Sequence, residues 1–330
     1  MKKSIYIYND STLSRKDNSI RLCLNTGEIK DLPIEQLDEI FYMAQGSINT
    51  SILSLLSQHE VTVHFFGWYD NYLGTFLPKK SLLSGRMLIK QAEHYMNEER
   101  RVYLAKAFIL AATANMYRNL RYYKSRGKDV DQEMKNIQIL KESIKNVTSV
   151  KELMGKEGNI RKEYYKAWPK IINQDLEFNK RVMNPPDNEI NSIISFVNSV
   201  IYAKCLSEIY KTQLNPTISY LHEPGERRYS LCLDISEIFK PILGDRIIFR
   251  LLNRGQITKD SFDKELNGLH LTQKASKLIM QEIDKTMKIT IYHKTLDRDV
   301  TYQYLIRLEC YKLVKHLLGE KDYVGTELWW

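Results

Sequence analysis

Residues 72–110, YLGTFLPKKSLLSGRMLIKQAEHYMNEERRVYLAKAFIL, contain the point at which the sequence changes from one repeating pattern to another. Residues 72–77 are rich in aromatic and β-branched side chains, which is typical of a β-strand. After the Pro-Lys-Lys at 78–80 the apolar residues recur three or four positions apart, which predicts helix. We therefore expect two domains, residues 1–80 and residues 81–330, that meet at this point.

The first domain is predicted to be mainly β-strand. Runs of β-branched and aromatic residues predict strands at Ile5–Tyr8, Ile20–Leu24, Glu28–Leu32, Glu39–Met43, Val61–Trp68 and Tyr72–Leu77. The second and third of these flank Asn-Thr-Gly at 25–27, a turn sequence, so we expect them to form a hairpin. Apolar residues at helical spacing predict one short helix over Ser51–Gln58.

The second domain is predicted to be helical throughout. A long helical pattern covers Leu82–Tyr123, and the polar stretch Lys124–Asn136 is expected to be a loop or an exposed helix start. Further helices are predicted at Gly158–Trp168, Asn188–Lys211, Ile235–Leu252, Leu271–Lys285 and Val300–Leu318. The expected fold class is α+β, with a small β-rich N-terminal domain followed by a larger all-α C-terminal domain.

The composition excludes several classes of protein. No uninterrupted apolar stretch approaches the ~20 residues of a membrane helix, and the N-terminus lacks the apolar run of a signal peptide. We therefore expect a cytoplasmic protein with no membrane contact. The four cysteines are widely scattered without a CxxC pair, which argues against a zinc ribbon and a disulfide framework. Sequence motifs of nucleotide cofactors and common hydrolases are absent.

The net charge of +9 is unevenly distributed. Residues 1–80 carry 8 Lys and Arg against 9 Asp and Glu, whereas residues 81–330 carry 41 against 31. All of the basic excess thus lies in the predicted helical domain. A polyanion such as a nucleic acid is the natural partner of such a surface.

Carboxylates and one histidine in three separated segments are the candidates for chemistry. Asp234 and Glu237 are three residues apart at an expected helix start, so both can face one side, or Asp234 is the N-cap and Glu237 its capping-box partner. His222 precedes a loop rich in Pro, Gly and Arg, which suits a site that faces phosphate. Glu157 lies near the start of a predicted helix, where the helix dipole alone favours a carboxylate.

These segments resemble those of a known family when they are taken in order. They comprise Glu157-Gly-Asn-Ile-Arg161 with Tyr164-Tyr165, Pro185-Pro186-Asp187, Asn191, Ser195-Phe196, Asn198, Leu221-His222-Glu223-Pro224, Leu231-Cys-Leu-Asp-Ile-Ser-Glu237, Pro241 and Asn253-Arg254-Gly255. Together they resemble the motifs of the universal Cas1 integrase family of CRISPR adaptation. The strand-rich character of the first domain also matches that family.

The resemblance implies a metal-dependent DNA endonuclease and integrase that inserts new spacers into CRISPR arrays. A glutamate, a histidine and a third acidic residue bind the metal, and these fall on Glu157, His222 and Glu237, with Asp234 in or near the site. The direct third ligand is either Asp234 or Glu237. We expect Mg²⁺ or Mn²⁺, because oxygen ligands with one imidazole suit these ions and no cysteine accompanies the site.

Basic residues interleaved with tyrosines are the candidate DNA surface. One set comprises Arg118, Arg121, Lys124, Arg126 and Lys128 with Tyr117, Tyr122 and Tyr123, and a second comprises Arg161, Lys162, Tyr164 and Tyr165. Basic side chains neutralise phosphates and aromatic rings stack on unpaired bases, although a solvated helix face with core tyrosines has the same pattern. Arg227 and Arg228 are predicted phosphate clamps because they follow His222.

The resemblance further implies a homodimer formed through the N-terminal domain, two copies of which flank a Cas2 dimer in a hetero-hexameric complex on protospacer and repeat DNA. The C-terminal Trp329-Trp330 is expected either to contact a partner or to cover the helical domain. Two other functions stay open. One is a branched-DNA repair nuclease that uses the same residues, and the other is a non-catalytic DNA-binding scaffold whose acidic residues only cap helices.

Overall fold

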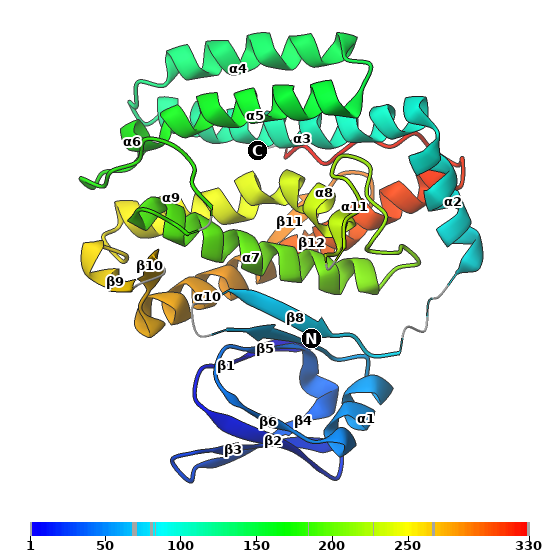
Figure 1. Cartoon of the computed structure of the whole chain (residues 1–330), viewed down its shortest axis with the longest axis vertical. Coiled ribbons are helices and arrows are strands. Elements are labelled where there is room, and N and C mark those ends of the chain that lie inside the picture. The colour runs from blue at the N-terminus through cyan, green and yellow to red at the C-terminus, as the bar shows by residue number, and fades with distance from the viewer. Residues whose placement is uncertain are drawn as a thin grey trace.

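The protein is described here by a computed structural model that covers residues 2–67, 71–79, 82, 84–183, 185–226, 228–265 and 268–328. A β-rich N-terminal part lies against a larger, mostly helical part, as the sequence predicts (Figure 1). The last strand of the first part ends at Phe76 and the first helix of the second begins at Gly85. Arg227 and Trp329-Trp330, which the sequence analysis singled out, lie outside the described residues.

Two four-stranded sheets form the N-terminal part. The first has the order β1-β5-β7-β8, made of Lys3–Ile7, Leu37–Tyr42, Thr62–Phe66 and Tyr72–Phe76. The second has the order β4-β3-β2-β6, made of Ile29–Pro33, Ser19–Leu24, Ser11–Lys16 and Gly46–Ile48. The predicted hairpin is confirmed, because β3 and β4 pair antiparallel and Gly27 has a φ of 88° in the turn between them. The predicted short helix is α1 (Thr50–Gln58).

Strand β5 separates two cores, because successive residues of a strand point to opposite faces of the sheet. Ile40 packs between the two sheets with Leu13, Ile20 and Leu55, and all four side chains are fully buried. Phe41, the next residue, packs with the helical part instead. The N-terminal sheet therefore buries one face against its own domain and the other against the helices.

The helical part is built around α7 (Glu189–Tyr210), which is buried along most of its length. The other helices are α2 (Gly85–Met96), α3 (Glu98–Lys124), α4 (Asp131–Ser143), α5 (Val150–Lys166), α6 (Trp168–Ile171), α8 (Ser230–Phe239), α9 (Arg246–Asn253), α10 (Gln273–Lys288) and α11 (Tyr302–Leu317). Among the described residues α7 alone has the length and hydropathy of a membrane span, but 78% of that stretch is buried inside the protein. It is the core helix of the domain.

Several helix boundaries differ from the prediction for identifiable reasons. The pattern over 82–123 is two helices, because the Asn97 side chain accepts a hydrogen bond from the amide of Arg100 and so starts α3 anew. The polar stretch 124–136 contains the start of α4. Two short hairpins, β9–β10 (Phe262–Glu265, Gly268–Leu271) and β11–β12 (Thr290–His293, Arg298–Thr301), accompany the helices.

A π-helical segment, η3 (Lys240–Asp245), joins α8 to α9 in what the sequence predicts as one helix over 235–252. It begins with Lys-Pro, and Pro241 has no amide hydrogen to donate to the helical ladder. Segments of this kind often occur at functional sites. The helical run thus continues from α8 into α9 through one segment whose turns are wider than those of an α-helix.

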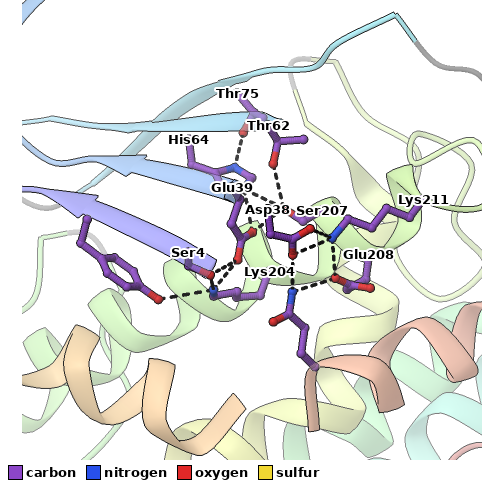
Figure 2. Close-up of polar contacts among 12 residues, drawn as sticks. Ser4, Asp38, Glu39, Thr62, His64, Thr75, Lys204, Ser207, Glu208 and Lys211 are labelled. Carbon is purple, nitrogen blue, oxygen red and sulfur yellow. Dashed lines mark hydrogen bonds and ion pairs between the residues drawn. The ribbon is translucent and has the colours of Figure 1, made fainter. Parts of the chain in front are cut away.

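The seam between the two parts holds a network of buried charges (Figure 2). Glu39 on β5 contacts the ammonium of Lys204 on α7, and it accepts hydrogen bonds from Ser4 and Ser207 at 2.7 Å each. Lys211 bridges Asp38 and Glu208 at 2.8 and 3.1 Å. We call this set, with His64, Gln303 and Arg307, the seam cluster. It ties the first sheet to α7 and α11.

Candidate active site

Helix α5 carries Glu157 and Arg161 on one face. The helix begins at Val150 because the Ser149 side chain accepts a hydrogen bond from the amide of Glu152, at 3.3 Å. Glu157 therefore lies in the helix interior, and the dipole of the first turn does not explain it. One turn further on, the Arg161 guanidinium donates to the Glu157 carboxylate.

Helix α8 carries Asp234 and Glu237, and it begins earlier than predicted. Its first residue is Ser230, and Tyr229 stands at the N-cap without a side-chain bond. The interpretation of Asp234 as N-cap and Glu237 as its capping-box partner is therefore wrong. Both side chains are buried in the interior of the helix. The scaffold function, in which these residues only cap helices, loses its structural explanation for them.

Asp234 orients His222. Its carboxylate is fully buried and accepts four hydrogen bonds, from the amides of Tyr220, Leu221 and His222 at 2.6, 3.0 and 3.0 Å and from His222 Nδ1 at 2.8 Å. Because Nδ1 is the donor in that bond, Nε2 is the ring nitrogen left with a free lone pair. Both Asp234 oxygens are thus used inside the protein. This arrangement favours Glu237 over Asp234 as the direct third ligand.

The loop that contains His222 is also held from α3. Arg101 donates to the carbonyl of Tyr220 at 3.0 Å and to the Glu223 carboxylate at 2.6 Å. This contact with Arg101 lowers the pKa of Glu223. The sequence analysis did not identify Arg101, because it lies 119 positions from Tyr220. The loop is therefore fixed at two points, from α3 and from α8.

Glu237 lies between two cations. Arg161 contacts the Glu237 carboxylate as well as that of Glu157, and Lys240 contacts Glu237 Oε1 at 2.6 Å. Burial opposes the charge of Arg161, but Glu157 raises the pKa of that guanidinium nonetheless. Burial, reinforced by the charge of Arg161, lowers the pKa of Lys240 to about 7. The spacing of three between Glu237 and Lys240 on one helix was visible in the sequence and could have revealed this residue.

The donor set is suited to a hard divalent cation. Among the residues that the structure describes, no three His, Cys, Asp or Glu side chains are gathered closely enough to hold an ion. Instead the Arg161 guanidinium lies between Glu157 and Glu237 and shows that this pair of carboxylates accommodates positive charge. With His222 Nε2, two carboxylates give the oxygen-rich set that Mg²⁺ and Mn²⁺ accept. These residues fit the predicted metal, which stays a prediction.

The predicted DNA-contacting residues have different surroundings. Lys162 is exposed on α5. Tyr165 is partly buried, and its ring packs on Trp168 and Phe178 with centroids 5.4 and 5.7 Å away. Arg228 donates to the backbone oxygen of Glu223 at 2.9 Å and stays exposed. Tyr164 is fully buried, as expected of a core tyrosine.

Comparison with known proteins identifies the family. The family model described as "CRISPR associated protein Cas1" matches residues 5–285. The chain is 53% identical, over 100% of its length and 98% of the relative's, to a "CRISPR-associated endonuclease Cas1" of Fusobacterium nucleatum. It superposes with a TM-score of 0.88 and 36% identity on a CAS1 protein from Thermotoga maritima, covering 98% of this chain and 100% of that one.

A further solved structure shares the fold alone. It is a "casposase bound to integration product", with a TM-score of 0.88 and 21% identity over 98% of this chain and 93% of that one. The sequence motifs, the family model and the full-length relative agree with one another. The chain belongs to the CRISPR-associated protein Cas1 family.

Proposed function

We propose that the protein is a divalent-metal-dependent DNA endonuclease and integrase of CRISPR spacer acquisition. It joins the 3′-hydroxyl ends of a protospacer to the CRISPR repeat by transesterification, and it cleaves DNA when water is the nucleophile. One observation carries the proposal. Glu157 and Glu237 face one cation on neighbouring helices, one turn of α8 away from the carboxylate that orients His222.

The reaction exchanges one phosphodiester bond for another. The bond from phosphorus to the leaving oxygen of the repeat breaks as the bond to the attacking 3′-oxygen forms. The attacking hydroxyl gives up its proton to solvent, and the leaving oxygen takes up a proton to become a hydroxyl. The metal, when bound, neutralises phosphate charge and favours deprotonation of the attacking hydroxyl. Asp234 holds the His222 ring in one tautomer for ligation. Arg161 and Lys240 provide positive charge for phosphate oxygens beside the carboxylates.

The partners of this reaction belong to the proposal. The basic excess of the helical part suits protospacer and repeat DNA. A homodimer through the N-terminal part, assembled with Cas2 into a hetero-hexamer in the cytoplasm, is what the family resemblance implies. Two catalytic sites on such an assembly would act at the two ends of one repeat.

A strand-transfer assay tests the proposal. A short duplex is incubated with a supercoiled plasmid that carries a repeat, in Mn²⁺, with and without Cas2. Wild type is compared with Glu157→Ala, His222→Ala and Glu237→Ala. Glu152→Ala is the matched control, because Glu152 lies exposed in the first turn of the same helix α5.

The expected result is joining by wild type and by Glu152→Ala. The three site variants should bind DNA with unchanged affinity and lose at least about a hundredfold in joining, the scale for residues that stabilise a transition state. Joining by all three variants at the wild-type rate would show that the site is wrong. Joining that needs neither Cas2 nor the repeat would favour the branched-DNA repair nuclease instead.

A further inference from the structure

A cavity of about 510 Å³ lies beside η3. It is enclosed by the C-terminal end of α3, by η3 and α9, by α10 and by the start of α11. Four arginines, Arg126, Arg246, Arg250 and Arg254, line it together with Tyr122 and Tyr302. None of its described lining residues is acidic. The cavity therefore offers a concentration of positive charge for an anion.

The arginine charges are only partly neutralised. Arg250 pairs with Glu282 at 2.9 Å, but Glu282 is shared with Lys285 at 3.1 Å. The Arg250 Nε is buried and has no hydrogen-bond acceptor among the described residues, which is unfavourable for a donor removed from water. Arg126 and Arg254 are exposed and have no ion-pair partner in the part of the chain that the structure describes. A phosphate oxygen entering the cavity would supply the missing acceptors.

An exposed aromatic ring stands at the cavity wall. Tyr122 is 47% exposed, and the Arg126 guanidinium lies over its ring at 5.3 Å from the centroid. Tyr122 and Tyr123 pack nearly perpendicular to each other, with ring centroids 5.1 Å apart and an interplanar angle of 85°, which holds the Tyr122 ring in place. A ring with a cation beside it is the usual platform on which proteins stack an unpaired base next to a phosphate.

The dimensions of the cavity select the kind of nucleic acid. Its volume lies within the range of ~300–1,000 Å³ that holds one small ligand, so one nucleotide with its phosphate fits. A double helix is far wider than such a hollow. Only an unpaired stretch of one strand presents a base and a phosphate together to the same cavity.

The π-helical segment connects the cavity to the catalytic side. Lys240 contacts Glu237, and a π-helix brings Asp245 to the same face five residues later, where burial and the charge of Asp245 together raise the pKa of Tyr164. Ile242 and Arg246 face the cavity instead. Asn119, on the cavity wall, donates to the Tyr164 hydroxyl at 3.0 Å and to the Pro241 oxygen at 2.8 Å. One helical segment thus separates the two sites.

We propose that this cavity is a second nucleic-acid subsite, which binds an unpaired nucleotide of a DNA strand. Its phosphate lies among Arg126, Arg250 and Arg254, and its base stacks on Tyr122. The subsite needs no metal and none of the catalytic carboxylates. The subsite rests on the proposed function, because that function identifies DNA as the ligand. It deepens that function by assigning a place beside η3 to single-stranded DNA.

Fluorescence anisotropy with a labelled decathymidine strand tests this subsite, in EDTA so that no reaction occurs. The full-length Arg126→Ala/Arg254→Ala variant is compared with wild type and with Arg15→Ala/Arg86→Ala, a control that removes two exposed arginines elsewhere. If each arginine contacts one phosphate, the slope of log K against log salt falls by ~0.7 per contact and by ~1.4 in the double variant. The control variant should keep the wild-type slope and affinity.

Tyr122→Leu tests the stacking contact. This variant should bind decathymidine about tenfold more weakly than wild type does. For an abasic strand of the same length, the variant and wild type should have equal affinities. Free thymidine monophosphate is added as a competitor to separate a strand from a loose nucleotide. Weak competition by thymidine monophosphate supports a DNA strand as the ligand. Complete competition at an equal concentration of phosphate groups would overturn that assignment.

The result that overturns the subsite is equal binding of decathymidine by wild type and by the Arg126→Ala/Arg254→Ala variant. That result is independent of the strand-transfer assay. If wild type joins DNA but these arginines do not affect strand binding, only the subsite is contradicted. If wild type fails to join DNA but binds single strands through these arginines, only the proposed integrase function is contradicted.

Discussion

Two clusters of charge in this molecule differ in how far their charged groups are satisfied by the protein itself. In the seam cluster, Lys204 and Glu39 have side chains 1% and 0% exposed, and each is satisfied by groups of the protein (Figure 2). In the candidate active site, Glu157 and Glu237 are 17% and 7% exposed and share one guanidinium. The first cluster is sealed, and the second is open to an added cation.

The difference shows how to tell a structural charge cluster from a functional one. A buried ion pair is tolerated when every oxygen and every proton has a partner within the fold, as around Glu39. In the active site two carboxylates contact the one guanidinium of Arg161, and the second cation, Lys240, has its pKa lowered to about 7 by burial. The His222 ring also keeps one nitrogen free. The local excess of acceptors there, and not burial alone, marks the place for a ligand.

Breaking the sealed cluster should have the largest effect. Lys204→Met leaves the Glu39 carboxylate buried without its cation, so the free energy of unfolding should fall by about 3–5 kcal/mol. The double variant Lys204→Met/Glu39→Leu, which leaves no charge behind, should recover most of that loss. Urea denaturation followed by circular dichroism measures both. A Lys204→Met variant as stable as wild type would contradict the interpretation of the seam cluster as a sealed structural cluster.

Adding a divalent metal should distinguish the two clusters. Mn²⁺ at a hundred times its dissociation constant should stabilise the wild type by about 2.7 kcal/mol, because only the folded chain holds the ligands together. Glu237→Gln should lose this stabilisation, whereas Glu39→Gln, a less stable protein, should keep it in full. Thermal melts with and without Mn²⁺ give the two differences. Equal responses of the two variants would contradict the assignment of the open cluster.

Disturbing the orientation of His222 should have a smaller effect. Asp234→Asn replaces one acceptor oxygen by a donor that faces backbone amides, so the ring loses its fixed tautomer. We expect Mn²⁺ affinity to fall about 10–100-fold. Isothermal titration with Mn²⁺ measures this directly and separates it from a loss of stability. Unchanged Mn²⁺ affinity in a folded Asp234→Asn variant would show that the carboxylate has no role in ligation.

The smallest effect concerns pH and the sealed cluster. Burial lowers the pKa of His64 below its ordinary 6.5, so the unfolded chain binds a proton that the folded chain rejects. Stability from this group is complete above pH 6.5 and falls as the pH drops below it. His64→Gln should flatten the decline below pH 6.5, whereas His59→Gln, outside the seam, should leave it unchanged. Unfolding free energies at several pH values test this.

Local patterns of the sequence predict most of the helices and strands. The features that the sequence does not predict depend on contacts between distant elements. The hairpin around Gly27 and the helix over residues 51–58 follow from turn chemistry and periodicity. The early start of α5 was missed because half of its first turn is polar, and that of α8 because Tyr229, at its N-cap, is not a capping residue. The pairing of Glu39 with Lys204 was not predictable, because 165 positions separate them.

The site itself was predicted in part. The family resemblance named Glu157, His222 and Glu237, and spacing alone could have added Lys240. The role of Arg161 as a bridge depends on how α5 packs beside α8, which no periodicity encodes. The role of Asp234 in orienting His222 likewise depends on a loop that folds back over the helix.

The π-helical segment η3 can be understood as one residue too many in a helix that would otherwise run from α8 into α9. The wider turn of a π-helix absorbs this residue, so the side chains after η3 keep the phase that they would have in an α-helix one residue shorter. Glu237, before the wide turn, contacts Arg161 of the catalytic site, and Arg246, after it, lines the cavity. One helical run therefore carries residues of both sites. Deleting one residue of η3 would replace the wide turn by an ordinary helical turn and leave the rotational phase of α8 and α9 unchanged.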